Sequence, residues 1–212
     1  MSYDVVDTTE IDNDLHRSIF EKAEPFLRTR HNDVHAIISY RHAKHILAME
    51  GGNSSIVLPA VLLHDVGWSA VPEERQLHAF GPELRDPDLR RRHETEGAKL
   101  ARAILSEMSY PQDMIRRIER IIDVHDSRTD AIDIDDLIVK ESDRLFRYSR
   151  TGFAIIFQGF NREPREYLAW LSKVAESWFC TGSAYRLAHE EIKKREKDLD
   201  KNFYSLLCDE SL

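Results

Sequence analysis

A histidine and an aspartate stand side by side at the end of an apolar run. His64 and Asp65 follow the segment VLPAVLL and precede Val66-Gly67. Both side chains need polar partners there, because burial of an unpaired polar or charged group is costly. A divalent metal ion would partner both, since imidazole and carboxylate suit zinc, iron, manganese or nickel. Taken alone, the pair is explained equally well by the end of a helix, where the histidine caps the C-terminus and the aspartate lies in the turn.

Four other helix-like segments each carry one metal-competent residue close to an apolar face. They are His35, His93, His125 and Asp143. Any one of them, on its own, is explained as a polar core residue with a hydrogen-bond partner. Five segments that all turn such a residue inward favour one shared metal site, because a buried histidine or aspartate is costly unless it is paired or metal-bound.

The order of these residues resembles the signature of HD-domain proteins, which are metal-dependent phosphohydrolases with an all-helical fold. The first histidine is His35, and the pair stands in the sequence LLHDVG. The last ligand, Asp143, stands in ESDRL, which is similar to the family's D-x-D-R-L segment. The resemblance covers approximately residues 30–148 and is specific for the superfamily rather than for one substrate.

The resemblance implies a site for two divalent ions. Family members with histidines on the two intervening helices hold two ions, bridged by the aspartate of the pair. The implied ligands are His35, His64, Asp65, His93, His125 and Asp143. The identity of the metal stays open among iron, manganese, nickel, cobalt, zinc and magnesium. A cyclic-dinucleotide phosphodiesterase branch is not expected, because Trp68 replaces the lysine of its HD-x-G-K motif and no GYP tripeptide follows.

This ligand set predicts hydrolysis of a small phosphorylated substrate, a nucleotide or another phosphoester. Metal ions can activate water at neutral pH, so His64 and Asp65 are the expected catalytic residues. No P-loop, nucleophile elbow or glycine-rich dinucleotide fingerprint suggests another mechanism. Phosphate oxygens favour cationic partners. The expected substrate-binding residues are Lys140, Arg144, Trp68 and His31.

Two other functions remain open at this point. Some HD-fold proteins with the same six ligands hold two irons and oxidise a small polyol or phosphonate with dioxygen. That diiron oxygenase is the alternative, and hydrolysis is favoured because it is commoner in the superfamily. A non-catalytic HD module is the third reading, and the intact ligand set argues against it.

The pattern predicts an all-α, HD-domain-like helical bundle with a C-terminal helical extension. Apolar residues recur at helical spacing, and no segment alternates with the period of a strand. Expected helices span 12–29, 33–50, 55–65, 87–108, 111–126, 134–148, 164–179 and 183–207. Residues 66–86 are the longest irregular connection. We expect a single domain over 1–212, with a ligand-bearing core at about 30–148 and an extension at about 149–212.

Composition fits a globular protein and limits its partners. The 212 residues carry a net charge of −8, which argues against a nucleic-acid polymer as the partner. No apolar run reaches the roughly 20 residues of a membrane span, and the N-terminus does not resemble a signal peptide. Cys180 and Cys208 are expected to be free thiols, so a cytoplasmic location is expected. The aromatic-rich extension is read as core, with a pocket wall or a homodimer surface as alternatives.

Overall fold

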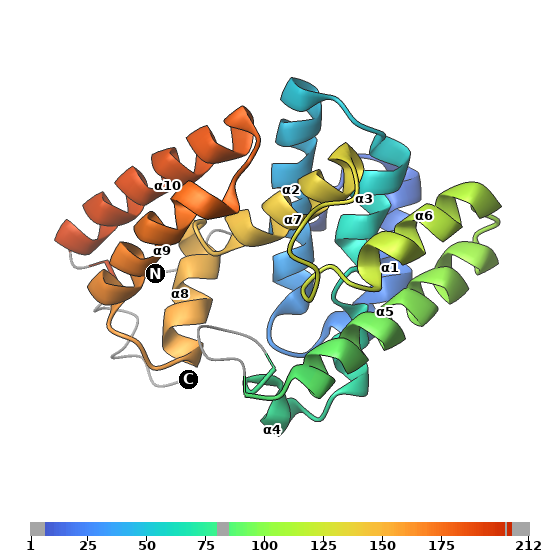
Figure 1. The fold of residues 1–212 in the computed structure, drawn as a ribbon, viewed down its shortest axis with the longest axis horizontal. Helices are drawn as coiled ribbons and strands as arrows, with labels where there is room; N and C mark the ends of the chain where they lie inside the picture. Colours follow the sequence, from blue (N-terminus) through green and yellow to red (C-terminus); the bar gives the residue numbers. More distant parts are fainter. Residues whose placement is uncertain (1–6, 80–84, 202, 205–212) are drawn as a thin grey trace.

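The computed structural model describes residues 7–79, 85–201, 203 and 204, and these residues form an all-helical fold (Figure 1). No strand occurs among them. Two short 3-10 helices, η1 (Thr8–Glu10) and η2 (Val66–Ala70), accompany the α-helices. The α-helices are α1 (Asp14–Leu27), α2 (Asn32–Glu50), α3 (Ser54–Leu63), α4 (Glu73–Gln76), α5 (Pro87–Glu107), α6 (Gln112–Ile122), α7 (Ile134–Phe146), α8 (Arg150–Gly159), α9 (Pro164–Trp178) and α10 (Gly182–Asp200).

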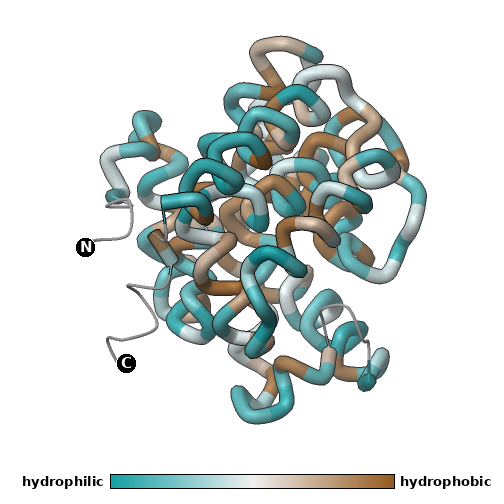
Figure 2. The backbone as a smooth tube through the Cα atoms, turned by 90° about the vertical axis from the view of Figure 1, so that its left-hand side faces the viewer, coloured by the Kyte–Doolittle hydropathy of each residue, from teal (hydrophilic) through white to brown (hydrophobic). Residues whose placement is uncertain are grey.

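Helix α3 lies at the centre of the bundle. All of its residues from Ile56 to Leu63 are buried, and it packs against α1, α2, α6 and α7. A helix that is apolar on every side is stable only when other helices surround it. Figure 1 shows α5 and α6 on one side of this centre and α8, α9 and α10 on the other. Figure 2 shows apolar stretches of the backbone toward the inside of the bundle and hydrophilic stretches toward its outside.

Side-chain caps fix where α3 and α5, two of the ligand-bearing helices, begin. The Asn53 side chain accepts a hydrogen bond from the backbone N–H of Ser55 at the start of α3. Asp86 caps α5 in the same way, with Pro87 as its first residue. These caps satisfy backbone donors that have no partner within the helix. They set the register in which each helix presents its metal-competent side chain to the centre.

The structure confirms the predicted all-α class and corrects two details of the prediction. Residues 66–86 are not one irregular connection, because η2 and α4 form within them. The buried Gln76 amide fastens α4 to η2 by donating to the carbonyls of Trp68 and Val71. Helix α8 was not predicted, although its apolar residues have helical spacing. The end of the helix predicted at 183–207 lies outside the described residues.

Helices α8 to α10 share a hydrophobic core with the rest of the bundle. Phe153, Phe157 and Leu171 belong to the same continuous buried cluster as the residues of α3. Polar contacts reinforce this packing, since the Tyr148 hydroxyl donates to the carbonyl of Leu171 at 3.0 Å. None of the described helices is both long and apolar enough to cross a membrane.

Candidate metal centre

Two His-Asp pairs meet in the centre of the fold, each just beyond the end of a helix. His64 follows α3, and its Nδ1 lies 2.7 Å from the carbonyl of Val61. His125 follows α6, and its Nδ1 lies 2.9 Å from the carbonyl of Ile122. A carbonyl can only accept, so both Nδ1 atoms are the protonated donors. Each ring therefore presents Nε2 to the site, as metal-binding histidines do.

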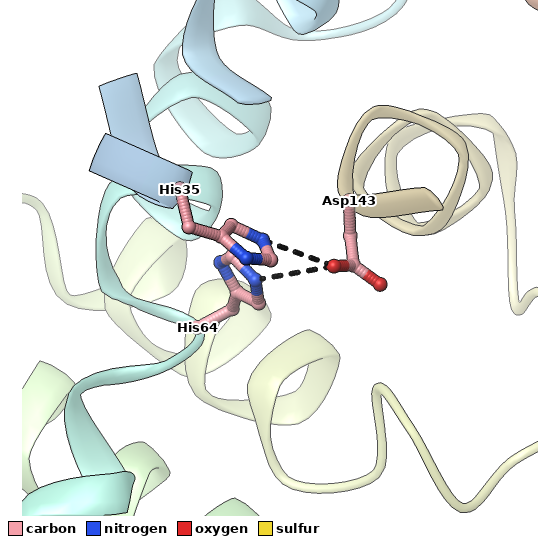
Figure 3. Close-up of side chains that lie close together, drawn as sticks. All are labelled: His35, His64 and Asp143. Carbon is pink, nitrogen blue, oxygen red and sulfur yellow. Dashed lines mark ion pairs between the residues drawn. The ribbon is translucent and has the colours of Figure 1, made fainter. Parts of the chain in front are cut away.

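The first group of donors consists of His35, His64 and Asp143, which come from α2, the end of α3 and α7 (Figure 3). One oxygen of Asp143 lies 3.0 Å from Nε2 of His35 and 3.8 Å from Nε2 of His64. The His35 ring stacks on Phe146 at a centroid distance of 4.4 Å, which fixes its plane. The Nε2 atoms of both histidines are buried without a hydrogen-bond partner in the described part of the chain.

Asp65 lies between this group and a second one. Its Oδ2 faces His64 Nε2 at 3.7 Å and His35 Nδ1 at 3.9 Å. Its Oδ1 faces His125 Nε2 at 3.6 Å and accepts a hydrogen bond of 3.0 Å from Trp68 Nε1. The two oxygens of one carboxylate thus point to different groups of imidazoles. This orientation suits an aspartate shared by two ions.

The second group consists of His93, His125 and Asp126. His93 Nε2 lies 3.4 Å from His125 Nε2 and 3.5 Å from Asp126 Oδ2. Asp126 was not among the residues predicted from the sequence. The signal was present, because His125-Asp126 repeats the His-Asp pair at the end of another apolar run.

These residues fit divalent metal ions. Donor atoms bound to one tetrahedral ion at about 2.1 Å lie about 3.4 Å apart, which is close to the separations in both groups. A buried His64 Nε2 with no hydrogen-bond partner among the described residues suits a ligand of another kind. Imidazole and carboxylate donors are the set that zinc, iron, manganese, nickel and cobalt accept.

The pKa shifts in the centre favour a cation there. Burial tends to raise the pKa of Asp65, but the surrounding imidazoles hold it well below its usual value. Arg147 and His35 likewise outweigh burial and lower the pKa of Asp143. Burial also opposes charge on His125, yet Asp126 and Asp65 raise its pKa to about 10. The carboxylates therefore stay ionised and create a negative potential at the point where the imidazoles converge.

Comparison with known families gives one match. The matching model is that of the HD domain, and it covers residues 32–148, more than half of the chain. The chain belongs to the HD domain family. No curated protein and no solved structure is significantly similar to it. HD domains are typically metal-dependent hydrolases, and the described residues include groups of histidine and aspartate that could hold a metal ion.

A tight backbone contact holds the first HD pair against the helix of His93. A Cβ atom added to Gly67 would lie 1.8 Å from the carbonyl oxygen of His93 and 2.5 Å from the nitrogen of Gly97. Only glycine fits where two backbones approach this closely. The glycine that follows the HD pair therefore allows η2 to pack on α5 and brings Asp65 close to His93.

A buried carboxylate holds the second pair. Glu94 is fully buried and accepts hydrogen bonds from the backbone N–H groups of Asp126 and Ser127 at 2.9 and 2.7 Å. It also accepts from the Ser127 hydroxyl and from Arg91. Glu94 thus ties the turn after His125 to α5.

A cavity of about 220 Å³ opens beside both donor groups of the HD domain. His125, Asp126 and Asp143 contribute to its lining. Four cationic side chains also line it, together with Trp170 and Trp178, and the guanidinium carbons of Arg144 and Arg147 each lie 5.7 Å from the Trp178 ring. The cations are Arg90, Lys140, Arg144 and Arg147. Arg90 and Arg147 were not predicted, because their positions at the cavity depend on the tertiary arrangement of the helices and not on spacing along the chain.

Lys140 and Arg144, both predicted substrate-binding residues, line this cavity and are also anchored to the protein. Lys140 Nζ donates to the carbonyls of His125 and Arg128, and the first of these bonds is 2.5 Å long. Arg144 donates to the carbonyl of Trp178 at 2.6 Å. These bonds fix the position of each charge at the edge of the cavity.

Trp68 and His31, the other two predicted substrate-binding residues, lie in different surroundings from one another. Trp68 is 2% exposed and stacks on the His93 ring at 3.9 Å, so it contacts metal-competent residues directly. It lines a second, smaller cavity together with Arg30, whose guanidinium carbon lies 4.6 Å from the indole ring. His31 is exposed in a left-handed conformation before α2 and lines neither of these two cavities.

Proposed function

We propose that this HD domain is a metal-dependent phosphohydrolase that cleaves a small phosphorylated substrate by means of metal-activated water. One observation supports the proposal above the others. The larger cavity combines four cations with His125, Asp126 and Asp143 at one wall. A chain with a net charge of −8 thus places a cluster of positive charge directly beside its metal-competent residues. Phosphate oxygens bind best where such cations converge.

Three arginines have separate roles in this proposal. Arg147 donates to Asp143 at 3.4 Å, so it orients this carboxylate while its charge faces the cavity. Arg144 is held by the carbonyl of Trp178 and is available to the outer phosphate oxygens. Arg90 has a buried Nε atom with no hydrogen-bond partner in the described residues, which suits a donor for a bound anion.

When bound, divalent ions supply a nucleophile from water at neutral pH and stabilise the charge that develops on phosphate. The residues of the chain orient the substrate around that chemistry. Trp170 and Trp178 meet edge to face at 5.3 Å and line the cavity beside the cations. This aromatic wall excludes water and offers a flat apolar surface to the organic part of a phosphoester.

The diiron oxygenase alternative makes different demands on this cavity. A neutral polyol carries no negative charge for the four cations to bind, whereas a phosphonate is an anion that they would bind. The decisive test therefore measures both reactions with the same protein. Metal-free protein is reconstituted with manganese, cobalt, nickel or ferrous iron. Phosphate release from a panel of phosphoesters and dioxygen uptake with polyols and phosphonates are then recorded.

We expect phosphate or nucleotide release that a chelator abolishes and that manganese, cobalt or nickel restores. Arg144→Gln should raise KM about tenfold or more at unchanged metal content, because it removes a charge-assisted contact worth roughly 1.5–3 kcal/mol. Arg165→Gln is the matched control, since Arg165 is exposed on α9 and pairs with Asp200 away from the cavity. Stoichiometric dioxygen uptake by the iron form, without hydrolysis of any phosphoester, would overturn the proposal.

A further inference from the structure

We propose that Asp126 is a metal ligand, in addition to the six residues that the family resemblance implies. It would complete a second metal centre with His93 and His125, and Asp65 would be shared with the first centre. This inference builds on the metal-dependent function proposed above. It concerns the composition of the site rather than the reaction, so binding measurements can test it separately.

The geometry of the second group is that of three ligands around one point. The His93 and His125 Nε2 atoms are 3.4 Å apart. Asp126 Oδ2 lies 3.5 Å from the first and 3.9 Å from the second. All three separations approach the spacing of about 3.4 Å between neighbouring ligands of a tetrahedral ion. The first group, with separations of 3.0 and 3.8 Å around Asp143, is no better formed.

Other roles for the Asp126 carboxylate find less support. Within the described residues, no lysine or arginine nitrogen lies within 4 Å of it, and its ion-pair contacts are the two imidazoles alone. It does not cap a helix either, because it lies in the turn after α6. A carboxylate in contact with two buried imidazoles has the surroundings of a ligand.

The backbone of Asp126 is held where a ligand would need it. Glu94 accepts hydrogen bonds from the N–H groups of Asp126 and Ser127, and Glu94 directly follows His93 on α5. One buried carboxylate thus fixes the distance between His93 on one helix and the His125-Asp126 pair beyond another. Supporting residues of this kind typically change metal affinity 10–100-fold when they are removed.

The assignment also distinguishes the two centres by their access to substrate. The side chains of Asp65 and Asp143 are 8% and 13% exposed, whereas that of Asp126 is 27% exposed. Asp126 lines both cavities, so an ion that it binds would face the cationic pocket. The second centre is therefore the one expected to contact the phosphate of the substrate.

Manganese binding to the metal-free full-length protein tests the inference by isothermal titration calorimetry, without any phosphoester present. We expect the unmodified protein to bind two ions. Asp126→Asn should weaken one of them at least tenfold and leave the other within twofold. Asp130→Asn is the matched control, because Asp130 is exposed four residues further along and should bind as the unmodified protein does. Circular dichroism verifies that each variant is folded.

Glu94→Gln provides a second variant that leaves the ligand itself in place. It should weaken the same ion 10–100-fold, because the turn that carries Asp126 loses its anchor. The inference is overturned if Asp126→Asn binds two ions with unchanged affinity. It is also overturned if the unmodified protein binds a single ion, with the same affinity as Asp126→Asn. Protein that binds both ions as predicted but hydrolyses nothing would contradict the proposed function and leave the ligand assignment intact.

Discussion

The two His-Asp pairs of this protein have the same local structure and different supports. In both, the histidine follows a helix and its Nδ1 donates to the carbonyl three residues earlier. After His64-Asp65, the chain packs backbone to backbone on α5 through Gly67. After His125-Asp126, the buried Glu94 side chain holds the turn instead. The same histidine geometry is thus obtained once by close packing and once by hydrogen bonds.

The two kinds of support leave the two aspartates exposed to different degrees. Close packing leaves Asp65 nearly inaccessible, with one oxygen turned to each donor group. The hydrogen-bonded turn leaves Asp126 at the wall of the cationic cavity. A shared, inaccessible carboxylate suits the task of holding two ions together. An accessible one suits the side at which substrate arrives.

The largest effect is expected from Asp65→Ala. Removal of the carboxylate between the two groups should lower the affinity for both ions and reduce hydrolysis below detection. The loss should exceed the roughly 100-fold cost of removing a supporting residue. Metal analysis after gel filtration measures it directly. If the variant keeps its full metal content, Asp65 does not join the two groups and the comparison above is wrong.

Trp68→Phe should have an intermediate effect. Phenylalanine keeps a ring next to His93 but removes the Nε1–H group that donates to Asp65. A hydrogen bond to a carboxylate contributes roughly 1.5–3 kcal/mol, so we expect an approximately tenfold fall in metal affinity or kcat. KM should stay constant, because the indole acts on Asp65 and His93.

The sequence-based prediction for Trp68 was that it shapes substrate access. That prediction gives the opposite kinetic result, a higher KM or an altered substrate preference at unchanged metal content. Measuring kcat, KM and metal content for the same preparation distinguishes the two readings.

The smallest effect concerns His42, a buried histidine that forms no ion pair with a carboxylate within the described part of the chain. Burial, together with Arg41, His45 and Lys194, lowers its pKa from 6.5 to about 3. Between about pH 3 and pH 6.5, His42 is therefore protonated in the unfolded chain and neutral in the folded chain. Burial of neutral His42 therefore leaves the free energy of unfolding unaffected by pH above pH 6.5 and lowers it as the pH falls through this window.

His42→Leu should therefore flatten the pH dependence of stability. The difference between the two proteins should approach about 1.4 kcal/mol per pH unit below pH 6. Urea unfolding at pH 7.5, 6.0 and 5.0 measures it. Parallel curves for both proteins would show that His42 can be protonated in the folded state. His125 differs from His42 because Asp126 and Asp65 outweigh the effect of burial.

The sequence predicted most helices, because the apolar spacing and the caps are local features. Helix α8 was missed because Gly152 and Gly159 weaken the helical pattern of its aromatic residues. Gly152 is required there, since an added Cβ would lie 2.0 Å from the carbonyl of Phe146. Such a contact between neighbouring helices has no signature in the sequence itself.

Some residues of the candidate site could be predicted from the sequence, and others could not. Residues on an inward helical stripe, such as His93, were recognisable from periodicity alone. Asp126 was overlooked because it lies in a turn, beyond the apolar pattern of α6. Glu94 and Arg147 depend on contacts with another helix or with the cavity. Their roles follow from tertiary packing, which spacing along the chain does not encode.

The contact between Gly67 and the carbonyl of His93 has a mechanical consequence. It leaves no space for η2 and α5 to slide past one another, so Asp65 and His93 are held in a fixed relation. The larger cavity is lined on α9 by Trp170 and Trp178, and α9 packs on α10, so we expect the cavity to widen at α9. We expect slow amide hydrogen exchange at Gly67 and Gly97 and faster exchange along α9. Substrate would then enter through movement of α9 and its two tryptophans, while η2 and α5 keep their positions.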